Sequence, residues 1–251
     1  MQKEETILSN FNTISLKEMD AVELMNRKDT KYFFNAEKLP LILSSLKTDY
    51  RVLLIENYRI FNYRNIYFDT EDFFCYYQHH NERVNRYKIR IRQYVESKLN
   101  FLEVKFKTNT NRTIKTRIKV PEFSPVISEE AKRFLVQQTP FDPDKLIQTL
   151  RNDFKRFTLI SNDLKERATI DTGLVLMTGD GERIFSNLCI AELKHDASSS
   201  GSLFKASMRR NYCPEMRISK YSIGTAFMYP ALKQNNWKEK KLRINRIEQN
   251  V

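Results

Sequence analysis

The sequence RYKIRIRQY, at residues 86–94, alternates cationic or polar side chains with apolar ones. The runs FLEVKFK at 101–107 and TIKTRIK at 113–119 repeat this alternation. Because successive side chains of a β-strand point to opposite faces, each run is predicted to form a strand with one apolar and one cationic face. The predicted cationic faces together carry eight Lys or Arg side chains and one carboxylate, namely Lys88, Arg90, Arg92, Glu103, Lys105, Lys107, Lys115, Arg117 and Lys119.

This excess of positive charge allows two interpretations. An antiparallel sheet commonly packs one face on a core and leaves the other in water, so a row of charges is often a solvated face. A solvated face usually mixes the two signs, however, because like charges directly opposite each other destabilise a sheet. The scarcity of carboxylates here favours a second interpretation, in which a polyanion lies between the strands. Phosphate is the obvious candidate.

The composition describes a chain that can bury a large core and that carries a strong positive charge. Of the 251 residues, 41% are hydrophobic and 12% are aromatic. These values suit one large β-rich domain or two small ones, and the lack of an evident linker between two cores favours a single domain over residues 1–251. The formal net charge is +12, from 43 Lys and Arg against 31 Asp and Glu. We therefore expect an anionic partner, which could be nucleic acid, a membrane surface or a phosphorylated substrate.

The cysteines and the N-terminus favour a cytoplasmic protein. Cys75, Cys189 and Cys213 are widely spaced and form no CxxC pair, which argues against a disulfide framework and a zinc site. The N-terminus MQKEETILSN lacks the basic region and apolar core of a signal peptide. No run approaches the roughly 20 apolar residues that a membrane helix needs. Any membrane-protein partner would therefore be a separately encoded chain.

Local patterns predict helices inserted between the strands. Helices are expected at 15–27, 36–47, 71–80, 129–138, 143–152, 203–210 and, as a basic C-terminal helix, 236–248. Strands in addition to the three cationic runs are expected at 29–34, 62–70, 155–161, 166–178 and 187–196. Ser15 and Glu18 have the spacing of a capping box at the start of the first of these helices. A Ser-rich segment at 198–202 is expected to be a loop.

About eight strands are enough to close an antiparallel sheet into a barrel, which removes its exposed edges. We therefore predict an α+β fold, an eight-stranded antiparallel β-barrel with helices packed on the outside. If the cationic faces turn inward, the interior of the barrel is a charged tunnel. Such an interior requires water and an anion, because unpaired buried charges are very costly.

Seven short motifs follow one another in an order that is typical of one family. They are RKDTKYF at 27–33, YFDT at 67–70, KIRIRQY at 88–94, EVK at 103–105, RATID at 167–171, AELK at 191–194 and ISKYSIG at 218–224. This set resembles the VTC (vacuolar transporter chaperone) domain, the polyphosphate polymerase branch of the triphosphate tunnel metalloenzymes, a CYTH-like superfamily. The resemblance spans about residues 15–235, which are therefore expected to form the core of the domain. The wider superfamily begins with an ExExK strand, whereas KDTKY at 28–32 offers Asp29 alone, as in the VTC branch.

The resemblance implies a tunnel in which the γ-phosphate of ATP is transferred to a growing polyphosphate chain. It implies catalytic roles for Arg90, Arg92 and Lys105. Phosphate or nucleotide contacts are expected, from the resemblance and from shared predicted faces, at Lys31, Tyr32, Lys88, Arg117, Arg156, Arg167, Lys194 and Lys220. The expected cofactor is Mn²⁺ or Mg²⁺, because these ions prefer oxygen ligands. Glu192 is the first candidate ligand, followed by Glu103 and Asp171; a salt bridge is the alternative role of Glu103.

Three functions remain open at this point. The first is ATP-dependent polyphosphate synthesis, and the second is hydrolysis of ATP or inorganic triphosphate by the same groups with water as nucleophile. The third is binding of polyphosphate, a nucleotide or nucleic acid without turnover. Nucleic acid is not expected, because the strands lack the aromatic platform of an RNA-recognition fold. The expected partners are therefore ATP and polyphosphate or pyrophosphate.

Overall fold

The computed structural model of the chain describes residues 2–20, 27–110, 112–196 and 201–249. Its α-helices are α1 Gln2–Leu8, α2 Leu16–Asp20, α3 Leu39–Leu46, α4 Phe74–His80, α5 Glu129–Gln138, α6 Leu203–Arg210, α7 Lys220–Met228 and α8 Lys238–Gln249. Its strands are β1 Thr13–Ile14, β2 Arg27–Asn35, β3 Tyr50–Leu53, β4 Phe61–Thr70, β5 Arg86–Tyr94, β6 Leu99–Lys107, β7 Thr113–Val120, β8 Leu146–Ser161, β9 Glu166–Thr178, β10 Gly181–Phe185 and β11 Leu188–Asp196. Short 3₁₀ helices are η1 Ala36–Lys38, η2 Pro143–Lys145 and η3 Asn235–Trp237.

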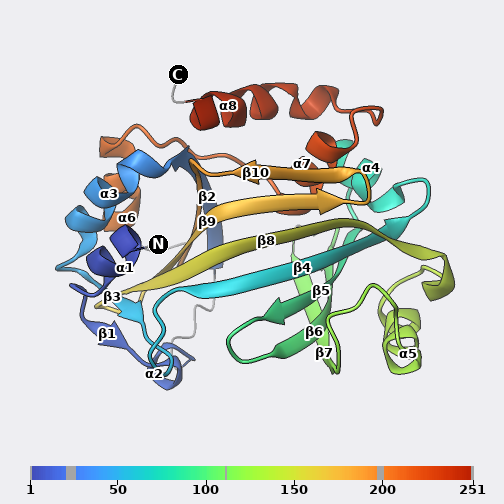
Figure 1. The fold of residues 1–251 in the computed structure, drawn as a ribbon, viewed down its shortest axis with the longest axis horizontal. Helices are drawn as coiled ribbons and strands as arrows, with labels where there is room; N and C mark the ends of the chain where they lie inside the picture. Colours follow the sequence, from blue (N-terminus) through green and yellow to red (C-terminus); the bar gives the residue numbers. More distant parts are fainter. Residues whose placement is uncertain (1, 21–26, 111, 197–200, 250–251) are drawn as a thin grey trace.

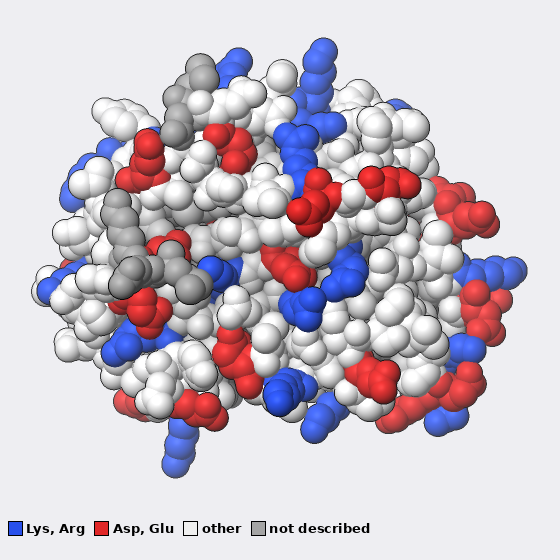
Figure 2. All heavy atoms as spheres, viewed as in Figure 1, with Lys and Arg blue, Asp and Glu red and all other residues white. Residues whose placement is uncertain are grey.

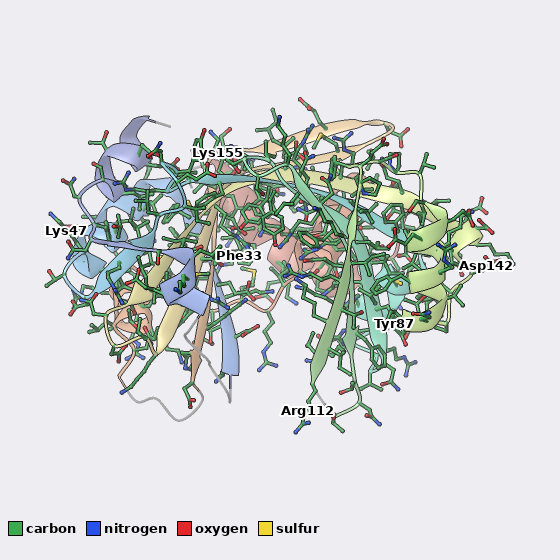
Figure 3. The ribbon with its side chains drawn as sticks, turned by 90° about the horizontal axis from the view of Figure 1, so that it is seen from below. Phe33, Lys47, Tyr87, Arg112, Asp142 and Lys155 are labelled. Atoms are coloured by element: carbon green, nitrogen blue, oxygen red, sulfur yellow. The ribbon has the colours of Figure 1, made fainter. Side chains whose placement is uncertain are left out.

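One large sheet organises these elements (Figure 1). Its main strand order is β2-β11-β9-β8-β4-β5-β6-β7, and every neighbouring pair in this order is antiparallel. The sheet bends, so that β2, β11 and β9 form one wall and β5, β6 and β7 form another, joined by β8 and β4 (Figure 3). Within the described residues no pairing joins β7 to β2. The predicted α+β fold with a large antiparallel sheet is confirmed, whereas its closure into a barrel is not.

The apolar strand faces pack outward against helices, as their alternation predicts. Ile89, Leu102 and Val104 of the second wall are buried in a core that also contains Leu135 of α5. The outward residues of the first wall form a separate core with α1, α3 and α6. In this core, Leu193 of β11 is buried together with residues of all three helices. Helices α1, α3, α5 and α6 therefore cover the outside of the sheet.

Helix α7 closes one end of the sheet's concave side, together with α4 and α8. Tyr221 of α7 belongs to a core with Phe154 of β8 and Trp237 of η3. Gly224 lies where α7 approaches β8, because a Cβ atom at this position would meet a methyl carbon of Leu150 at 2.7 Å. A side chain here would require the Leu150 side chain or the helix to shift. None of the helices in the described part of the chain is long and apolar enough to cross a membrane.

The local expectations differ from the structure mainly between α5 and β8. The helix predicted at 143–152 is wrong: only the 3₁₀ turn η2 is helical, and β8 begins at Leu146. Leu146 to Leu150 pair with β4, and these ladder bonds outweigh the helix-like start at Pro143. Helix α4 begins at Phe74 rather than at 71, and strand β10 was not predicted. The predicted helices at 129–138 and 203–210 are confirmed.

At the N-terminus the structure confirms the capping box and part of the helix behind it. The backbone N–H of Ser15 donates to the Glu18 carboxylate at 2.9 Å, and the backbone N–H of Glu18 donates to Ser15 Oγ at 3.3 Å. Residues 21–26 of the predicted helix lie outside the described residues, and so do residues 198–200 of the Ser-rich segment.

Candidate active site

The concave side of the sheet, which we call the inner face, collects the charged residues that the sequence singles out. Cross-strand partners share a side of a sheet, and Lys31 lies opposite Glu192 while Lys194 lies opposite Arg167. In the second wall Arg90 lies opposite Glu103 and Lys88 opposite Lys105. The two walls are close enough for Lys31 to lower the pKa of Lys88, and for Lys105 to lower the pKa of Glu192.

In the second wall, Glu103 is held by two cations. The Arg90 guanidinium donates from Nη2 at 2.5 Å and from Nε at 2.8 Å to Glu103 Oε2. Lys115 Nζ lies 2.5 Å from Oε1 of the same carboxylate. Glu103 is fully buried, and burial alone would raise its pKa, but Arg90, Arg92 and Lys115 together hold this pKa well below its usual range. The salt-bridge alternative for Glu103 is therefore what the structure contains.

A second buried carboxylate, Asp171 of β9, is occupied in the same way. Arg156 of β8 donates to it from Nε at 2.5 Å and from Nη2 at 2.8 Å. Lys220, the first residue of α7, donates to Oδ2. Burial opposes ionisation of Asp171, yet these two cations lower its pKa. A carboxylate bound by an Arg and a Lys has few lone pairs left for a metal ion.

Glu192 of β11 differs from both, because it forms no hydrogen bond or ion pair with any residue that the structure describes. Burial would raise its pKa, but the positive charges of Lys31, Lys194, Arg156 and Lys105 lower it well below the usual range. Its cross-strand neighbour Lys31 donates instead to the backbone carbonyl of Ile218 at 3.2 Å. Glu192 is thus an ionised carboxylate whose oxygens are not taken by a neighbouring cation.

These contacts decide how well a divalent ion would fit. Among the described residues there is no group of three or more His, Cys, Asp or Glu side chains that could hold a metal. Mg²⁺ is commonly bound by one or two carboxylates together with substrate phosphates. Glu192 fits that arrangement, and the phosphate oxygens of a nucleotide would have to supply further ligands. Glu103 and Asp171 fit it less well.

The remaining cations lie along the inner face at different exposures. Burial and then Lys31 lower the pKa of Lys88 to about 7. The charge of Arg90, followed by burial and by Arg92, lowers the pKa of Lys105 well below its usual range. An added phosphate anion would reverse this mutual repulsion and favour the protonated lysines. Arg117 lies on edge strand β7, exposed, with its guanidinium carbon 4.6 Å from the centre of the Phe101 ring.

Tyr32 is not brought together with the other predicted site residues. It follows Lys31 on β2, so its side chain lies on the opposite face, where it is buried 6.0 Å from the ring of Phe204. The nucleotide contact expected of Tyr32 has no support in this position. Strand alternation separates it from the inner face.

The sequence reasoning missed the neutral and aromatic members of the inner face. Tyr63 of β4 stacks on Phe154 with ring centres 5.4 Å apart, and the guanidinium carbons of Arg92 and Arg156 lie 5.2 and 5.0 Å from its ring centre. Arg90 also donates from Nη1 to the Tyr67 hydroxyl at 3.3 Å. The available signal was the alternation of residues 63, 65 and 67 in NYRNIYFDT.

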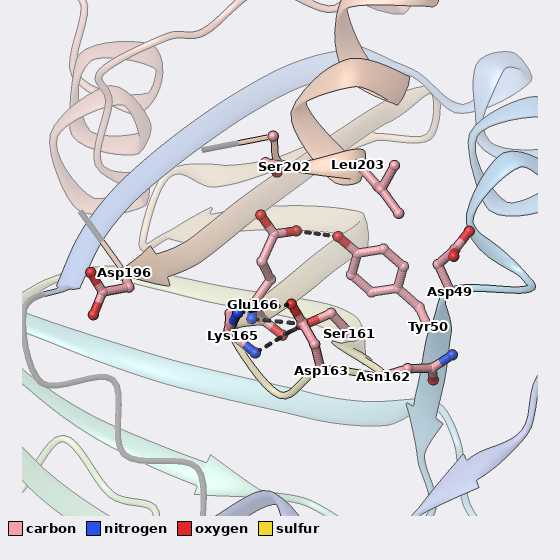
Figure 4. Close-up of a pocket in the computed structure, with 11 residues that line it drawn as sticks. Asp49, Tyr50, Ser161, Asn162, Asp163, Lys165, Glu166, Asp196, Ser202 and Leu203 are labelled. Atoms are coloured by element: carbon pink, nitrogen blue, oxygen red, sulfur yellow. Dashed lines mark hydrogen bonds and ion pairs between the residues drawn. The ribbon is translucent and has the colours of Figure 1, made fainter. Parts of the chain in front are cut away.

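Other surfaces offer less to a polyanion. A cavity of about 650 Å³ is lined by the carboxylates of Asp49, Asp163, Glu166 and Asp196 and, among the described residues, by a single cation, Lys165 (Figure 4). Tyr50 donates a hydrogen bond to Glu166 there. The net negative charge of this cavity would repel phosphate. On the molecular face in Figure 2, Lys and Arg side chains are interspersed with Asp and Glu. The described residues on that face therefore form no basic patch of the kind that follows a nucleic-acid backbone.

Comparisons with known proteins agree with the motif order. A family model described as the VTC domain matches residues 26–229. No curated protein matches the chain significantly.

Solved structures with a similar fold include a candidate adenylyl cyclase from Hippeastrum described as having a dominant triphosphatase activity, with 14% identity, a TM-score of 0.49, and coverage of 81% of this chain and 96% of that one. A candidate adenylate cyclase from Vibrio parahaemolyticus has 12% identity and a TM-score of 0.45, covering 78% and 96%. A Pyrococcus horikoshii protein has 13% identity and a TM-score of 0.46, covering 82% and 99%.

Proposed function

The chain belongs to the VTC domain family, a branch of the triphosphate tunnel enzymes, and from this premise we propose that it is an ATP-dependent polyphosphate polymerase. The observation that carries the proposal is the convergence of cations from both walls on one inner face. Arg90, Arg92 and Lys105 lie there on one wall, and Lys31 lies on the other, beside the unbridged Glu192. Phosphoryl transfer requires mainly positioning and neutralisation of charge, which such a face can provide.

In the proposed reaction, a terminal phosphate oxygen of the polyphosphate chain attacks the γ-phosphorus of ATP. The bond between that phosphorus and the β–γ bridging oxygen breaks, and ADP leaves with the bonding electron pair. Arg90 and Arg92 would bind phosphate oxygens with their planar forks, and Lys105 would act as a mobile point charge. Mn²⁺ or Mg²⁺, held by Glu192 and by phosphate oxygens, would supply further neutralising charge.

The direct test is incubation of the purified protein with ATP and Mn²⁺ or Mg²⁺, with and without pyrophosphate as primer. Products are resolved on a polyphosphate-staining gel, and free phosphate is assayed in parallel. We expect a metal-dependent polyphosphate ladder with release of ADP. Free phosphate without a ladder would assign the site to a triphosphatase, and ATP binding with neither product would assign it to a binding module.

Variants at the proposed catalytic cations test the residue roles. Arg92→Ala and Lys105→Ala should each lower the rate by about a hundredfold, because each removes one charge that stabilises the transition state. The matched control is Lys47→Ala, which removes an exposed cation after the end of α3, far from the inner face (Figure 3). Equal ATP turnover in Arg92→Ala, Lys105→Ala and the wild type would contradict the assignment.

A further inference from the structure

Arg92 is held differently from two other inner-face arginines, Arg90 and Arg156. Arg90 and Arg156 each form ion pairs with a buried carboxylate. Arg92 forms no ion pair within the described residues, although its exposed fraction is only 8%. Its Nε donates instead to the amide oxygen of Asn65 at 3.0 Å. An amide oxygen accepts this hydrogen bond without cancelling the positive charge of the guanidinium.

A second amide fixes the orientation of the first. Asn65 of β4 lies directly opposite Asn152 of β8, and both side chains are fully buried. Asn65 Nδ2 donates to Asn152 Oδ1 at 2.8 Å. Since a guanidinium can only donate, Asn65 must present its oxygen to Arg92 and its NH₂ group to Asn152. The three residues therefore form a directed row across β5, β4 and β8.

The row leaves the far end of Arg92 available. No residue in the described part of the chain accepts a hydrogen bond from its two terminal nitrogens. The Tyr63 ring flanks the guanidinium, 5.2 Å from Cζ, and is itself stacked on Phe154. Asn152 Nδ2 is buried without a partner among the described residues, which costs stability and is not explained by packing. The Asn65 amide and the Tyr63 ring thus orient the Arg92 guanidinium, and neither of them neutralises its positive charge.

We propose that Asn65 and Asn152 are positioning residues, which hold Arg92 as a phosphate ligand that is not ion-paired within the described residues and whose terminal nitrogens are directed away from the row. This inference rests on the proposed function, because it assigns the ligand as a phosphate of a triphosphate or polyphosphate. Amides serve here where carboxylates would fail: an Asp at position 65 would form an ion pair with Arg92 and compete with the phosphate charge.

The test is a double-mutant cycle read by binding of inorganic tripolyphosphate in calorimetry. Asn65→Asp and Asn65→Leu should each weaken binding about tenfold, the first by neutralising Arg92 and the second by freeing its orientation. In an Arg92→Ala background, Asn65→Leu should change the affinity by less than about twofold, because residues that act through one another are not additive. Asn65→Asp should still weaken binding in that background, because its carboxylate repels the phosphates directly. Asn235→Asp adds the same charge at an exposed position in η3 and should leave binding unchanged.

The outcomes separate this inference from the proposed function. If the wild-type protein does not bind tripolyphosphate, the proposed function fails. If it binds but the Asn65 variants bind equally well, or if Asn65→Leu loses as much affinity in the Arg92→Ala background as in the wild type, the positioning role is refuted. Circular dichroism checks folding of each variant. If Asn65→Leu does not fold, Asn152→Leu replaces it, with a smaller loss expected because Asn65 keeps its bond to Arg92.

Discussion

The two walls of the inner face each carry one glutamate, and the two carboxylates differ in whether neighbouring cations form ion pairs with them. In the second wall, the long side chain of Arg90 reaches across to Glu103, and Lys115 binds the other oxygen. In the first wall, Lys31 stands opposite Glu192 but donates to a backbone carbonyl of the segment before α7. The strand pattern around the two glutamates is similar. Their difference teaches that a carboxylate is available for a ligand only when its cationic neighbours have other acceptors.

The largest effect is expected from removing the bridged carboxylate. Glu103→Ala leaves Arg90 uncompensated in a buried site that is already rich in cations. Loss of one partner of a buried ion pair typically costs about 3–5 kcal/mol, and we expect a loss of unfolding free energy in this range from urea titration. The matched Glu192→Ala variant should lose much less, since no direct ion pair is broken. Equal losses in the two variants would abolish the distinction between the walls.

Activity should respond in the opposite order. Glu192→Gln removes the unbridged carboxylate and should lower metal-dependent turnover about a hundredfold, or about 2.7 kcal/mol. A metal titration should require more Mn²⁺ or Mg²⁺ to reach half-maximal rate, and chelation with EDTA should abolish turnover of the wild type. Glu103→Gln, if it remains folded, should keep the wild-type metal requirement. A changed metal requirement in Glu103→Gln alone would move the metal site to the second wall.

Lowering the pH should reveal how much the ionised carboxylates of Glu103 and Glu192 contribute to the free energy of unfolding. The pKa values of Glu103 and Glu192 lie below the ordinary value of 4.5, so below that pH the unfolded chain binds protons that the folded protein does not. Their contribution to stability is therefore present above about pH 4.5 and is lost as the pH falls, by about 1.4 kcal/mol per pH unit for each group. Urea unfolding between pH 6 and 3 should show a shallower acid loss in Glu103→Gln and in Glu192→Gln. An unchanged slope in either variant would show that its carboxylate titrates normally.

The smallest effect is expected at the exposed end of the bridged pair. The Lys115 side chain is 37% exposed, and Arg90 continues to hold Glu103 when it is removed. Lys115→Ala should therefore cost no more than about 1 kcal/mol of unfolding free energy. A loss as large as that of Glu103→Ala would mean that Lys115, rather than Arg90, holds the carboxylate.

The fold could be predicted where the chain alternates polar and apolar residues, and failed where a local pattern imitated another element. The three cationic strands follow from alternation alone. Residues 143–152 place Leu146 and Leu150 four apart after a proline, which is typical of a helix. Their strand conformation depends on pairing with β4, about 80 residues earlier in the chain. Closure of the sheet was predicted because it would remove the exposed strand edges. The pairings among the described residues do not include one that closes the sheet.

The charged residues of the site could be predicted from the sequence, whereas its neutral residues could not. Arg90 could be found because it lies in a strand-like run that alternates charged and apolar residues, whereas Lys31 and Glu192 were assigned from the resemblance to the VTC domain. Asn65 and Asn152 are neutral, and their roles depend on facing each other across two strands that are distant in sequence. The occupation of Glu103 and Asp171 likewise depends on the reach of side chains from neighbouring strands, which residue spacing within one strand does not specify.

The alternation that separates Lys31 from Tyr32 also limits how the gene can change. Deleting one codon within β2 would exchange the sides of every following residue in the strand, bringing Tyr32 inward and burying Lys31 among the helices. No single substitution would change the side of so many residues. Descendants of this sequence should therefore vary the identity of strand residues more readily than their number. Insertions and deletions should gather in surface connections such as that between β6 and β7.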